Sequence, residues 1–401
     1  MALANNFTIS GTGCALVDYL YKPIDFSGEV FKKHISGSPG DGGLSPGKLV
    51  FTEEFEKFSG LPYPQLRKEI TEGRAPVGTN IGGPSIVSMI HVAQLLHDLP
   101  AKVFFSGCKG NDEAGKYIEE KLLGTPLKTA IYKTSKRFTP FTDVLSDPDY
   151  DSGHGERIFI NNIGAAWDFL PSDLNDTFFD SQMVVFGGTA LVPNIHNTLH
   201  LLLEKAKQRG AITVVNTVYD FINEKNNPHK PWPIGDSDRT WSFIDILIAD
   251  KEEALRHSGC SSIDSALEFF REKGVGATII THGPHPVSLY TNNELFGETA
   301  PMQLPVSQLV KQEIRENPTQ AGDTTGCGDN FAGGVIAAVA RQQILNPGTR
   351  ASITKAVALG VASGGYACFY HGGTFFEKYP GEKKAKIQKY YDSYCLQTGL
   401  T

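Results

Sequence analysis

The order in which apolar and amphipathic segments follow one another constrains the fold of this chain more than any other feature. Short apolar runs, expected as strands, occur at residues 7–21, 102–106, 183–186, 212–215, 244–248 and 278–280. Segments with helical periodicity alternate with them, at residues 85–97, 113–123, 195–209 and 262–273. Strands that alternate with helices form parallel βαβ units. We therefore expect an α/β fold: a doubly wound, mainly parallel sheet flanked by helices, with ligands at the carboxyl ends of the strands.

Two stretches interrupt this alternation. Residues 22–80 carry a glycine-rich run at 37–43 and few helical signals, and residues 131–162 contain several short β segments. A decorated surface loop is one explanation for such segments. Because no stretch is rich enough in proline, glycine or serine to act as a linker, residues 1–401 are expected to form a single domain.

Composition argues against several classes of protein. A formal net charge of −7 leaves no global basic surface for nucleic acid. No apolar run is long enough to span a bilayer, and residues 1–7 lack the basic and apolar regions of a secretory signal. The six cysteines are scattered without a C-x-x-C pair, which argues against a zinc site or a disulfide framework. We expect reduced thiols and a cytoplasmic protein that binds neither membrane nor nucleic acid.

The C-terminal segment beyond Lys378 is rich in lysine, with Lys383, Lys384, Lys386 and Lys389. A solvated terminal helix explains this run better than a phosphate-binding patch does.

A glycine- and aspartate-rich turn stands before an apolar, helix-like run at residues 335–340. Residues 321–334 read A-G-D-T-T-G-C-G-D-N-F-A-G-G. Gly326 and Gly328 leave backbone N–H groups uncovered, and the helix dipole points at the same place, so the pattern predicts an anion site. Asp329 would repel an anion unless it takes the proton from a hydroxyl that attacks a phosphoryl group. Capping residues and glycine-rich turns are common, but the full string is far more specific than a lone G-x-G-D.

The string from Asp323 to Gly334 resembles the C-terminal signature of the ribokinase-like, or PfkB, family of carbohydrate and nucleoside kinases. The resemblance implies that Asp329 is the general base. It also implies that backbone donors at Gly326, Cys327 and Gly328 hold charge on the transferring phosphoryl group. The family usually has alanine where this chain has cysteine. The thiol either fills the same small space or is reactive, if the helix lowers its pKa.

The same resemblance implies a small β lid over the substrate, built from segments within 22–80 and 131–162. Arg157 lies in the second of these segments. It would neutralise charge on the substrate or the phosphate, or else form a salt bridge within the lid. A lid can also act as a dimer clasp in this family, so a homodimer is compatible with the sequence.

Two motifs would orient the acceptor. Asp18 closes an apolar run, and a carboxylate there can accept hydrogen bonds from two neighbouring hydroxyls of a sugar. Gly82 and Gly83 precede a predicted helix and resemble the family's G-G-x-x-x-N element, in which glycines let the substrate approach the backbone. Val87 replaces the asparagine that ends this element. An apolar valine suits a base, or a deoxygenated position of the sugar, better than a hydroxyl-rich ring.

Residues 250–253 follow a predicted strand and resemble the family's N-x-x-E motif, with Asp250 in place of asparagine. Glu253, together with Asp250, would organise Mg²⁺ and its waters, since this ion needs only one or two carboxylates. The resemblance implies that the nucleotide is lined by Thr281, Gly283, Asp323, Thr324, Gly326 and Gly328.

The sequence thus predicts an ATP- and Mg²⁺-dependent kinase that transfers the γ-phosphate to a hydroxyl of a small sugar. A nucleoside kinase similar to adenosine kinases is the alternative, and a catalytically silent ligand-binding relative is the second. Residues 11–16 begin like a dinucleotide fingerprint, but Leu16 occupies the third glycine position and no helix opens there. No G-x-x-x-x-G-K-[ST] string occurs. A requirement for a monovalent cation is left open by the sequence.

Overall fold

The main sheet runs through the middle of the molecule and has nine strands. The computed structural model describes residues 6–38, 40–153, 155–317, 322 and 324–400. From one edge to the other, the strands are β14 (Gly297–Leu304), β13 (His285–Asn293), β12 (Ala277–His282), β11 (Ile246–Asp250), β10 (Ile212–Asn216), β9 (Met183–Gly187), β1 (Phe7–Gly13), β5 (Ala101–Gly110) and β6 (Lys128–Ser135). Neighbouring strands from β12 to β6 are parallel to one another. At the opposite edge from β6, β13 pairs antiparallel with β12, and β14 pairs antiparallel with β13.

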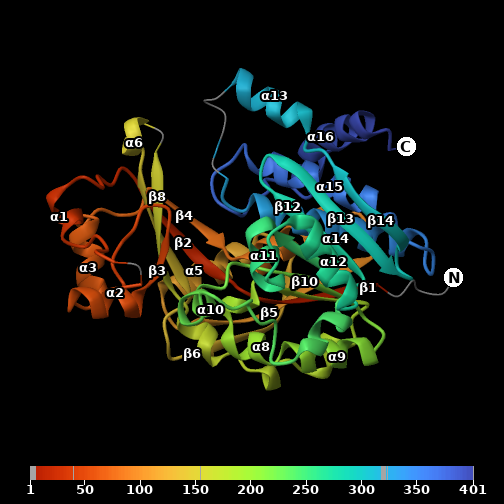
Figure 1. Ribbon diagram of the computed structural model, residues 1–401, viewed down its shortest axis with the longest axis horizontal. Coiled ribbons are helices and arrows are strands. Elements are labelled where there is room, and N and C mark those ends of the chain that lie inside the picture. The colour runs from red at the N-terminus through yellow and green to blue at the C-terminus, as the bar shows by residue number, and fades with distance from the viewer. Residues whose placement is uncertain (1–5, 39, 154, 318–321, 323, 401) are drawn as a thin grey trace.

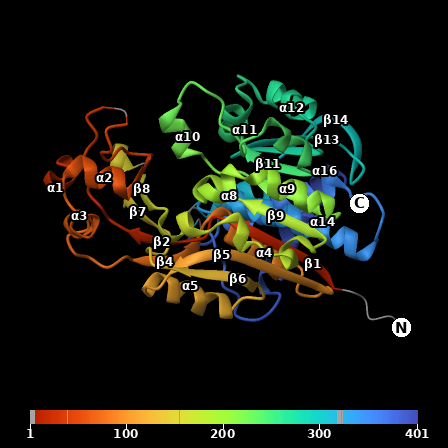
Figure 2. The ribbon, with the colours of Figure 1, turned by 90° about the horizontal axis from the view of Figure 1, so that it is seen from below.

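Helices cover both faces of this sheet (Figures 1 and 2). One core includes α4 (Pro84–Leu95), α5 (Glu113–Leu123), α13 (Gln308–Glu316), α14 (Cys327–Leu345), α15 (Ile353–Ala367) and α16 (Glu382–Thr398). The other includes α7 (Asp176–Phe179), α8 (Pro193–Asn197), α9 (Leu199–Gln208), α11 (Lys251–Ser258) and α12 (Ile263–Glu272). In β9, Met183 and Val185 face the first core while Val184 and Phe186 face the second. Burial on both faces is why the central strands read as continuous apolar runs.

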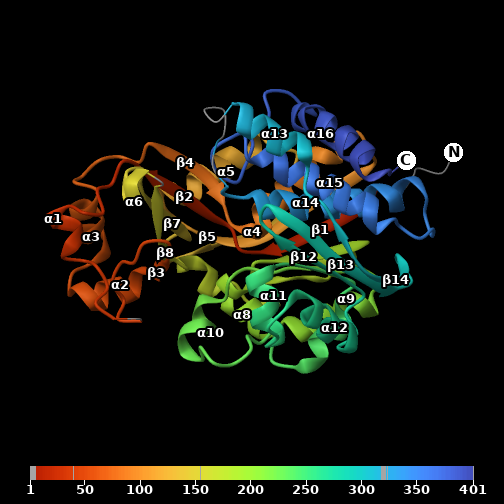
Figure 3. The ribbon, with the colours of Figure 1, turned by 45° about the horizontal axis from the view of Figure 1, so that its top comes forward.

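A second sheet of five strands, here called the small sheet, stands at one end of the molecule (Figure 3). Its order is β3 (Leu49–Phe51), β8 (Glu156–Asn162), β7 (Phe141–Asp147), β2 (Leu16–Tyr21) and β4 (Gly78–Gly82). Its outer face is covered by α1 (Glu29–Lys32), α2 (Thr52–Ser59) and α3 (Tyr63–Ile70). Asp143 of β7 is buried under these helices, where it accepts hydrogen bonds from Tyr63 and Arg67.

The remaining short elements are loops with local structure. They comprise α6 (Tyr150–Gly153), α10 (Phe221–Asn226) and the 3₁₀ turns η1 (Gly164–Asp168), η2 (Pro171–Asp173), η3 (Thr189–Leu191) and η4 (Asp238–Phe243). None of the helices in the described ranges meets the length and apolarity that a bilayer crossing requires.

The fold class expected from the sequence is confirmed, with differences in detail. The run at 7–21 is two strands, because the chain leaves the main sheet at Cys14 and enters the small sheet at Leu16. The strand β6, inside the stretch that was expected to build the lid, pairs with β5 in the main sheet instead. The helix expected at 195–209 is divided at Thr198 into α8 and α9.

Helices α14 and α15 approach each other closely through glycine. A Cβ atom at Gly334 would lie 2.6 Å from Ser363 Oγ, 2.8 Å from the Leu359 carbonyl oxygen and 2.9 Å from Gly360 Cα. Two of these three neighbours are backbone atoms, which cannot rotate away. The two helices are therefore held at a separation that only a glycine permits.

We expect Gly334→Val to lower the free energy of unfolding by about 1–3 kcal/mol, the usual range for overpacking a well-packed core. Urea unfolding monitored by circular dichroism measures this. Gly124→Val is the matched control, because Gly124 is exposed and has only the Lys121 carbonyl oxygen, at 3.5 Å, near its Cβ position. Equal stability of the two variants would contradict the close helix contact.

Candidate active site

The turn before α14 is shaped by one left-handed glycine. Gly326 is the N-cap of α14 with φ 75°, and a Cβ atom there would lie 2.4 Å from Gly373 Cα. Gly328 is exposed, and no atom lies within 4 Å of its Cβ position. The N–H of Cys327 donates to the Thr324 carbonyl oxygen at 3.3 Å, so this amide is engaged within the turn. The start of the helix thus presents an open, glycine-lined surface toward which its dipole points.

Asp329 lies in the first turn of α14, and burial raises the pKa of its carboxyl group to about 7. Nearby, burial and then the charge of Asp250 raise the pKa of Glu253 to about 8, with a smaller contribution from Asp329. The charges of Asp18 and Asp329 both act on the buried thiol of Cys14, whose pKa is raised mainly by burial. The charge of Asp329 therefore reaches both Cys14 at the end of β1 and Glu253 at the start of α11.

Four polar side chains form a row across the small sheet, here called the polar row. Asn161, Thr142, Asp18 and Asn80 are paired in register on β8, β7, β2 and β4. Asn161 Nδ2 donates to Thr142 Oγ1 at 2.9 Å. At the other end, Asn80 Nδ2 donates to the carbonyl oxygens of residues 371 and 374, both at 3.2 Å.

Gly82, the last residue of β4, makes room for Asp18, and Gly83, the N-cap of α4, makes room for the turn into that helix. A Cβ atom at Gly82 would lie 1.9 Å from Asp18 Oδ2, so the carboxylate rests where a side chain would otherwise be. Gly83 has φ 101°, and its Cβ would lie 2.7 Å from the Cys14 carbonyl oxygen. That carbonyl accepts hydrogen bonds from the N–H groups of Ser85 and Ile86, both at 3.2 Å.

Arg157 links the small sheet to the turn before α14. It lies on β8, four residues before Asn161. Because side chains alternate between the two faces of a strand, Arg157 and Asn161 lie on the same face. Its Nη1 donates to Thr325 Oγ1 at 3.0 Å and its Nη2 to Thr324 Oγ1 at 3.5 Å. The guanidinium group thus lies beside the open start of α14.

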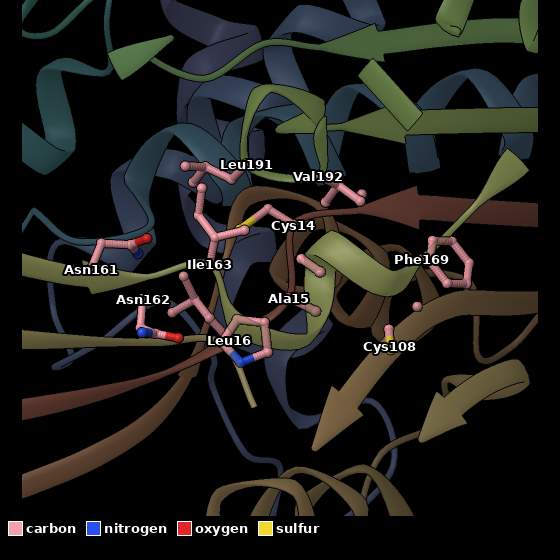
Figure 4. A pocket seen from close by; sticks show the side chains of 14 residues that line it. Cys14, Ala15, Leu16, Cys108, Asn161, Asn162, Ile163, Phe169, Leu191 and Val192 are labelled. Carbon is pink, nitrogen blue, oxygen red and sulfur yellow. The ribbon is translucent and has the colours of Figure 1, made fainter. Parts of the chain in front are cut away.

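A largely apolar cavity lies between the end of β1 and the small sheet (Figure 4). Its polar lining comes from Asn161 and Asn162, which Figure 4 shows on the same side as Leu16. The apolar lining includes Cys14, Ala15, Leu16, Pro140, Ile163, Ala166, Phe169, Leu191 and Val192.

A second, more open cavity of about 490 Å³ lies at the ends of β11 and β12. Thr281 and Gly283, predicted from the sequence to line the nucleotide, line it together with Asp250, which was predicted to help hold Mg²⁺. Asp250 Oδ1 accepts the N–H of Glu253 at 2.8 Å, and Glu253 Oε2 accepts the N–H of Asp250 at 3.1 Å, a capping box at the start of α11. Glu253 also accepts a hydrogen bond from Thr217 Oγ1 at 2.5 Å.

Of the residues predicted from the sequence, Asp250 and Thr281 lie at the carboxyl ends of β11 and β12, Asp18, Gly82 and Arg157 lie on the small sheet, and Asp329 lies in the first turn of α14. Asp323 lies outside the described residues. Within the described part of the chain, no group of three or more acidic, histidine or cysteine side chains is arranged to hold a metal ion.

Comparison with known proteins identifies the family. Residues 76–378 match the family model described as pfkB family carbohydrate kinase. The chain belongs to this family. It is therefore a kinase, a phosphotransferase with an alcohol group as acceptor. A search of curated proteins finds no match.

Solved structures show the same ribokinase-like fold. Adenosine kinase from Schistosoma mansoni, in complex with 2-fluoroadenosine, is 18% identical with a TM-score of 0.68, over 94% of this chain and 98% of that one. Adenosine kinase from Anopheles gambiae, in complex with P1,P4-di(adenosine-5) tetraphosphate, is 21% identical with a TM-score of 0.65, over 90% and 95%. Ribokinase from Thermotoga maritima is 18% identical with a TM-score of 0.61, over 96% and 99%.

Lys383 is a member of this site that sequence reasoning missed. The terminal helix is present as α16, but Lys383 is 1% exposed rather than solvated. Its Nζ donates to Asn330 Oδ1 at 2.6 Å, and burial lowers its pKa to about 7. Asn330 Nδ2 in turn donates to the carbonyl oxygens of Gly326 at 2.7 Å and Gly373 at 2.9 Å. The composition of a lysine-rich helix predicts that it is exposed to solvent. Nothing in the sequence shows which of its lysines is buried.

We expect Lys383→Met in this PfkB kinase to lower kcat by about 10- to 100-fold. The substitution leaves the buried side-chain oxygen of Asn330 without its donor, which costs about 1–3 kcal/mol, and the turn before α14 is then held less firmly. KM for the acceptor should change by less than about threefold, because Lys383 lies behind α14 and not beside the polar row. Steady-state kinetics measure both constants. Lys384→Met is the control, since Lys384 makes only an outer ion pair with Asp98. An unchanged kcat in Lys383→Met would show that the turn does not need this ammonium.

Proposed function

We propose that this protein transfers the γ-phosphate of ATP to a hydroxyl of a small sugar. The observation that carries the proposal is Asp329, a carboxylate with a pKa raised to about 7 at the glycine-lined start of α14. A group with a pKa near the working pH is well suited to take a proton and release it again. The family's description as carbohydrate kinases supports a sugar as the acceptor.

The chain's own residues divide the work between the two ends of the site. Asp18 accepts hydrogen bonds from acceptor hydroxyls and, with Gly82 underneath, fixes the position of the reactive oxygen. Asp329 removes the proton from that oxygen as it attacks. The open backbone at Gly328 and the guanidinium of Arg157 stabilise negative charge that develops on the phosphoryl oxygens.

The residues around Asp250 are compatible with MgATP. The cavity beside Thr281 and Gly283 is large and open, and Gly283 has no atom within 4 Å of its Cβ position. Mg²⁺ keeps most of its waters, so Glu253 and Asp250 are sufficient to hold it through one or two oxygens. When bound, Mg²⁺ would neutralise phosphate charge and orient the γ-phosphoryl group.

A nucleoside acceptor is a second candidate, because Val87 stands where the family's G-G-x-x-x-N element ends in asparagine, and an apolar side chain suits a base better than a hydroxyl-rich ring. The apolar cavity lined by Leu16, Ile163 and Phe169 has a volume of only about 10 Å³, room for about one water molecule, so it does not itself hold a base. The adenosine kinases among the structural matches support only the fold at this level of identity.

We expect Asp329→Asn to lower turnover by about 10²- to 10⁴-fold, the usual contribution of a general base, and to leave ATP affinity much less changed. The assay follows ADP release from MgATP over a panel of sugars, sugar phosphates and nucleosides. Turnover on one sugar that is lost in the variant would support both the reaction and the base. Turnover only on nucleosides would favour the second candidate. Bound ATP without turnover on any acceptor would favour a silent binding protein, and near-normal turnover in the variant would remove Asp329 from the mechanism.

The acid side of the pH profile gives an independent prediction. The base acts in its ionised form, and its raised pKa means that it becomes protonated as the pH falls through about 7. We expect kcat/KM for the acceptor, at saturating MgATP, to fall about tenfold per unit below that pH. Asp329→Asn should lose this dependence. A profile that stays flat down to pH 5 would contradict the raised pKa.

A further inference from the structure

Two cysteines meet beside the phosphate-binding turn. Cys327 is the first residue of α14, and Cys368 is the C-cap of α15. Their Sγ atoms are 3.4 Å apart, which is van der Waals contact between two sulfurs. The two residues are 41 positions apart in the sequence, so only the fold brings them together.

The backbone holds this pair in place. A Cβ atom at Gly364 would lie 2.9 Å from the Cys327 carbonyl oxygen, so the two helices are as close here as at Gly334. Cys368 Sγ lies 3.8 Å from the Gly364 carbonyl oxygen. Because the helices cannot move apart without losing this packing, the thiols stay within reach of each other.

The pair can also be reached from solvent. Both cysteines are partly exposed, whereas Cys14 and Cys108 are buried. The space in front of the turn at Gly328 is open, so a small molecule that enters the site can approach Cys327 from that side. Access and proximity together are what a thiol pair needs for exchange with a disulfide.

We propose that Cys327 and Cys368 form a modification site for small-molecule disulfides, at which oxidation to an intramolecular disulfide switches the enzyme off. The loss of activity rests on the proposed kinase function, whereas the formation of the bond does not. The reduced pair is the active form.

The reaction is an ordinary two-step exchange with a disulfide such as oxidised glutathione. The thiolate of one cysteine attacks a sulfur of that disulfide, whose S–S bond breaks and releases one thiolate, which takes up a proton. The second cysteine, as thiolate, then attacks the mixed disulfide. The Cys327–Cys368 bond forms, a second small thiol leaves, and two electrons have passed from the protein to the small disulfide.

The disulfide would disturb the turn before α14, because an S–S bond is shorter than the present distance between the two Sγ atoms. The sulfurs must close from 3.4 Å to the bond length of about 2.0 Å. Cys368 is anchored at the end of a buried helix, while Cys327 is followed by the exposed Gly328. The turn before α14 therefore moves more than α15 does. This movement shifts both the backbone that would face the phosphoryl group and the neighbouring Asp329.

The test uses the full-length protein, fully reduced and then equilibrated anaerobically with mixtures of reduced and oxidised glutathione. Free thiols are blocked in acid-quenched samples, and peptide mass mapping measures the fraction with a Cys327–Cys368 bond. Activity is measured in parallel and again after dithiothreitol. We expect activity to fall at least tenfold, in proportion to the fraction of this bond, and to return fully on reduction.

Each variant is compared with its own reduced form. Cys327→Ala, which installs the residue usual in the family, should lose the response to oxidised glutathione. Cys395→Ser, at a partly exposed cysteine of α16, should respond as the unaltered protein does. Cys368→Ser should stop at a glutathione adduct on Cys327 and form no internal bond.

Two results would overturn the proposal. One is the absence of a Cys327–Cys368 bond at a glutathione ratio that oxidises a dithiol reference peptide. The other is a fully formed bond with unchanged activity. If the reduced protein phosphorylates no acceptor, the proposed function fails, while the mapping still decides whether the bond forms.

Discussion

Asn330 holds the first turn of α14 through one amide group that contacts two carbonyl oxygens and one buried ammonium. It ties Gly326 to Gly373, and Lys383 fixes its orientation from behind. Burying a lysine carries a desolvation cost of several kcal/mol, which a single hydrogen bond and the rings of Tyr370 and Phe375 offset only in part. The buried ammonium of Lys383 therefore adds little to the stability of the fold, but it fixes the orientation of the Asn330 side chain. The place of the turn before α14, and with it of Asp329, depends on this contact.

The small sheet is attached to the same point. Asn80 at the end of the polar row donates to backbone carbonyls of the segment 371–374, and Thr374 Oγ1 donates back to the Ile81 carbonyl oxygen at 2.9 Å. That segment contains Gly373, which lies against Gly326. The polar row and the turn before α14 are therefore linked through backbone, and Arg157 of β8 bridges them a second time. A movement of the small sheet would change the position of the polar row and of this turn together.

The sequence was sufficient for the parallel strands β1, β5 and β9 to β12 of the main sheet and for a turn followed by a helix at Gly326, because these depend on local patterns: apolar runs buried on two faces, and a glycine where φ is positive. It failed where the answer depends on partners far along the chain. β6 has the same β pattern whether it joins the main sheet or the small one. The eight-residue helices α2 and α3 were missed because such short helices are stabilised by packing, here on β7 and β8, and only weakly by propensity. The burial of Lys383 and the contact of Cys327 with Cys368 are decided by tertiary packing, and no pattern in the neighbouring sequence predicts them.

Asp329 shows which of two opposed effects decides the chemistry of the turn. The dipole of α14 favours the ionised form of a carboxyl group in its first turn, but this is worth only about 1 kcal/mol. Burial opposes ionisation, and the pKa raised to about 7 means that burial prevails. An exposed aspartate at the same helix position would be fully ionised and too weak a base to accept a proton from an alcohol. Burial is thus what raises the pKa of this carboxyl group, and the hydrogen bond that Ser88 Oγ of α4 donates to the Asp329 backbone carbonyl oxygen at 2.9 Å ties the same residue to the neighbouring helix.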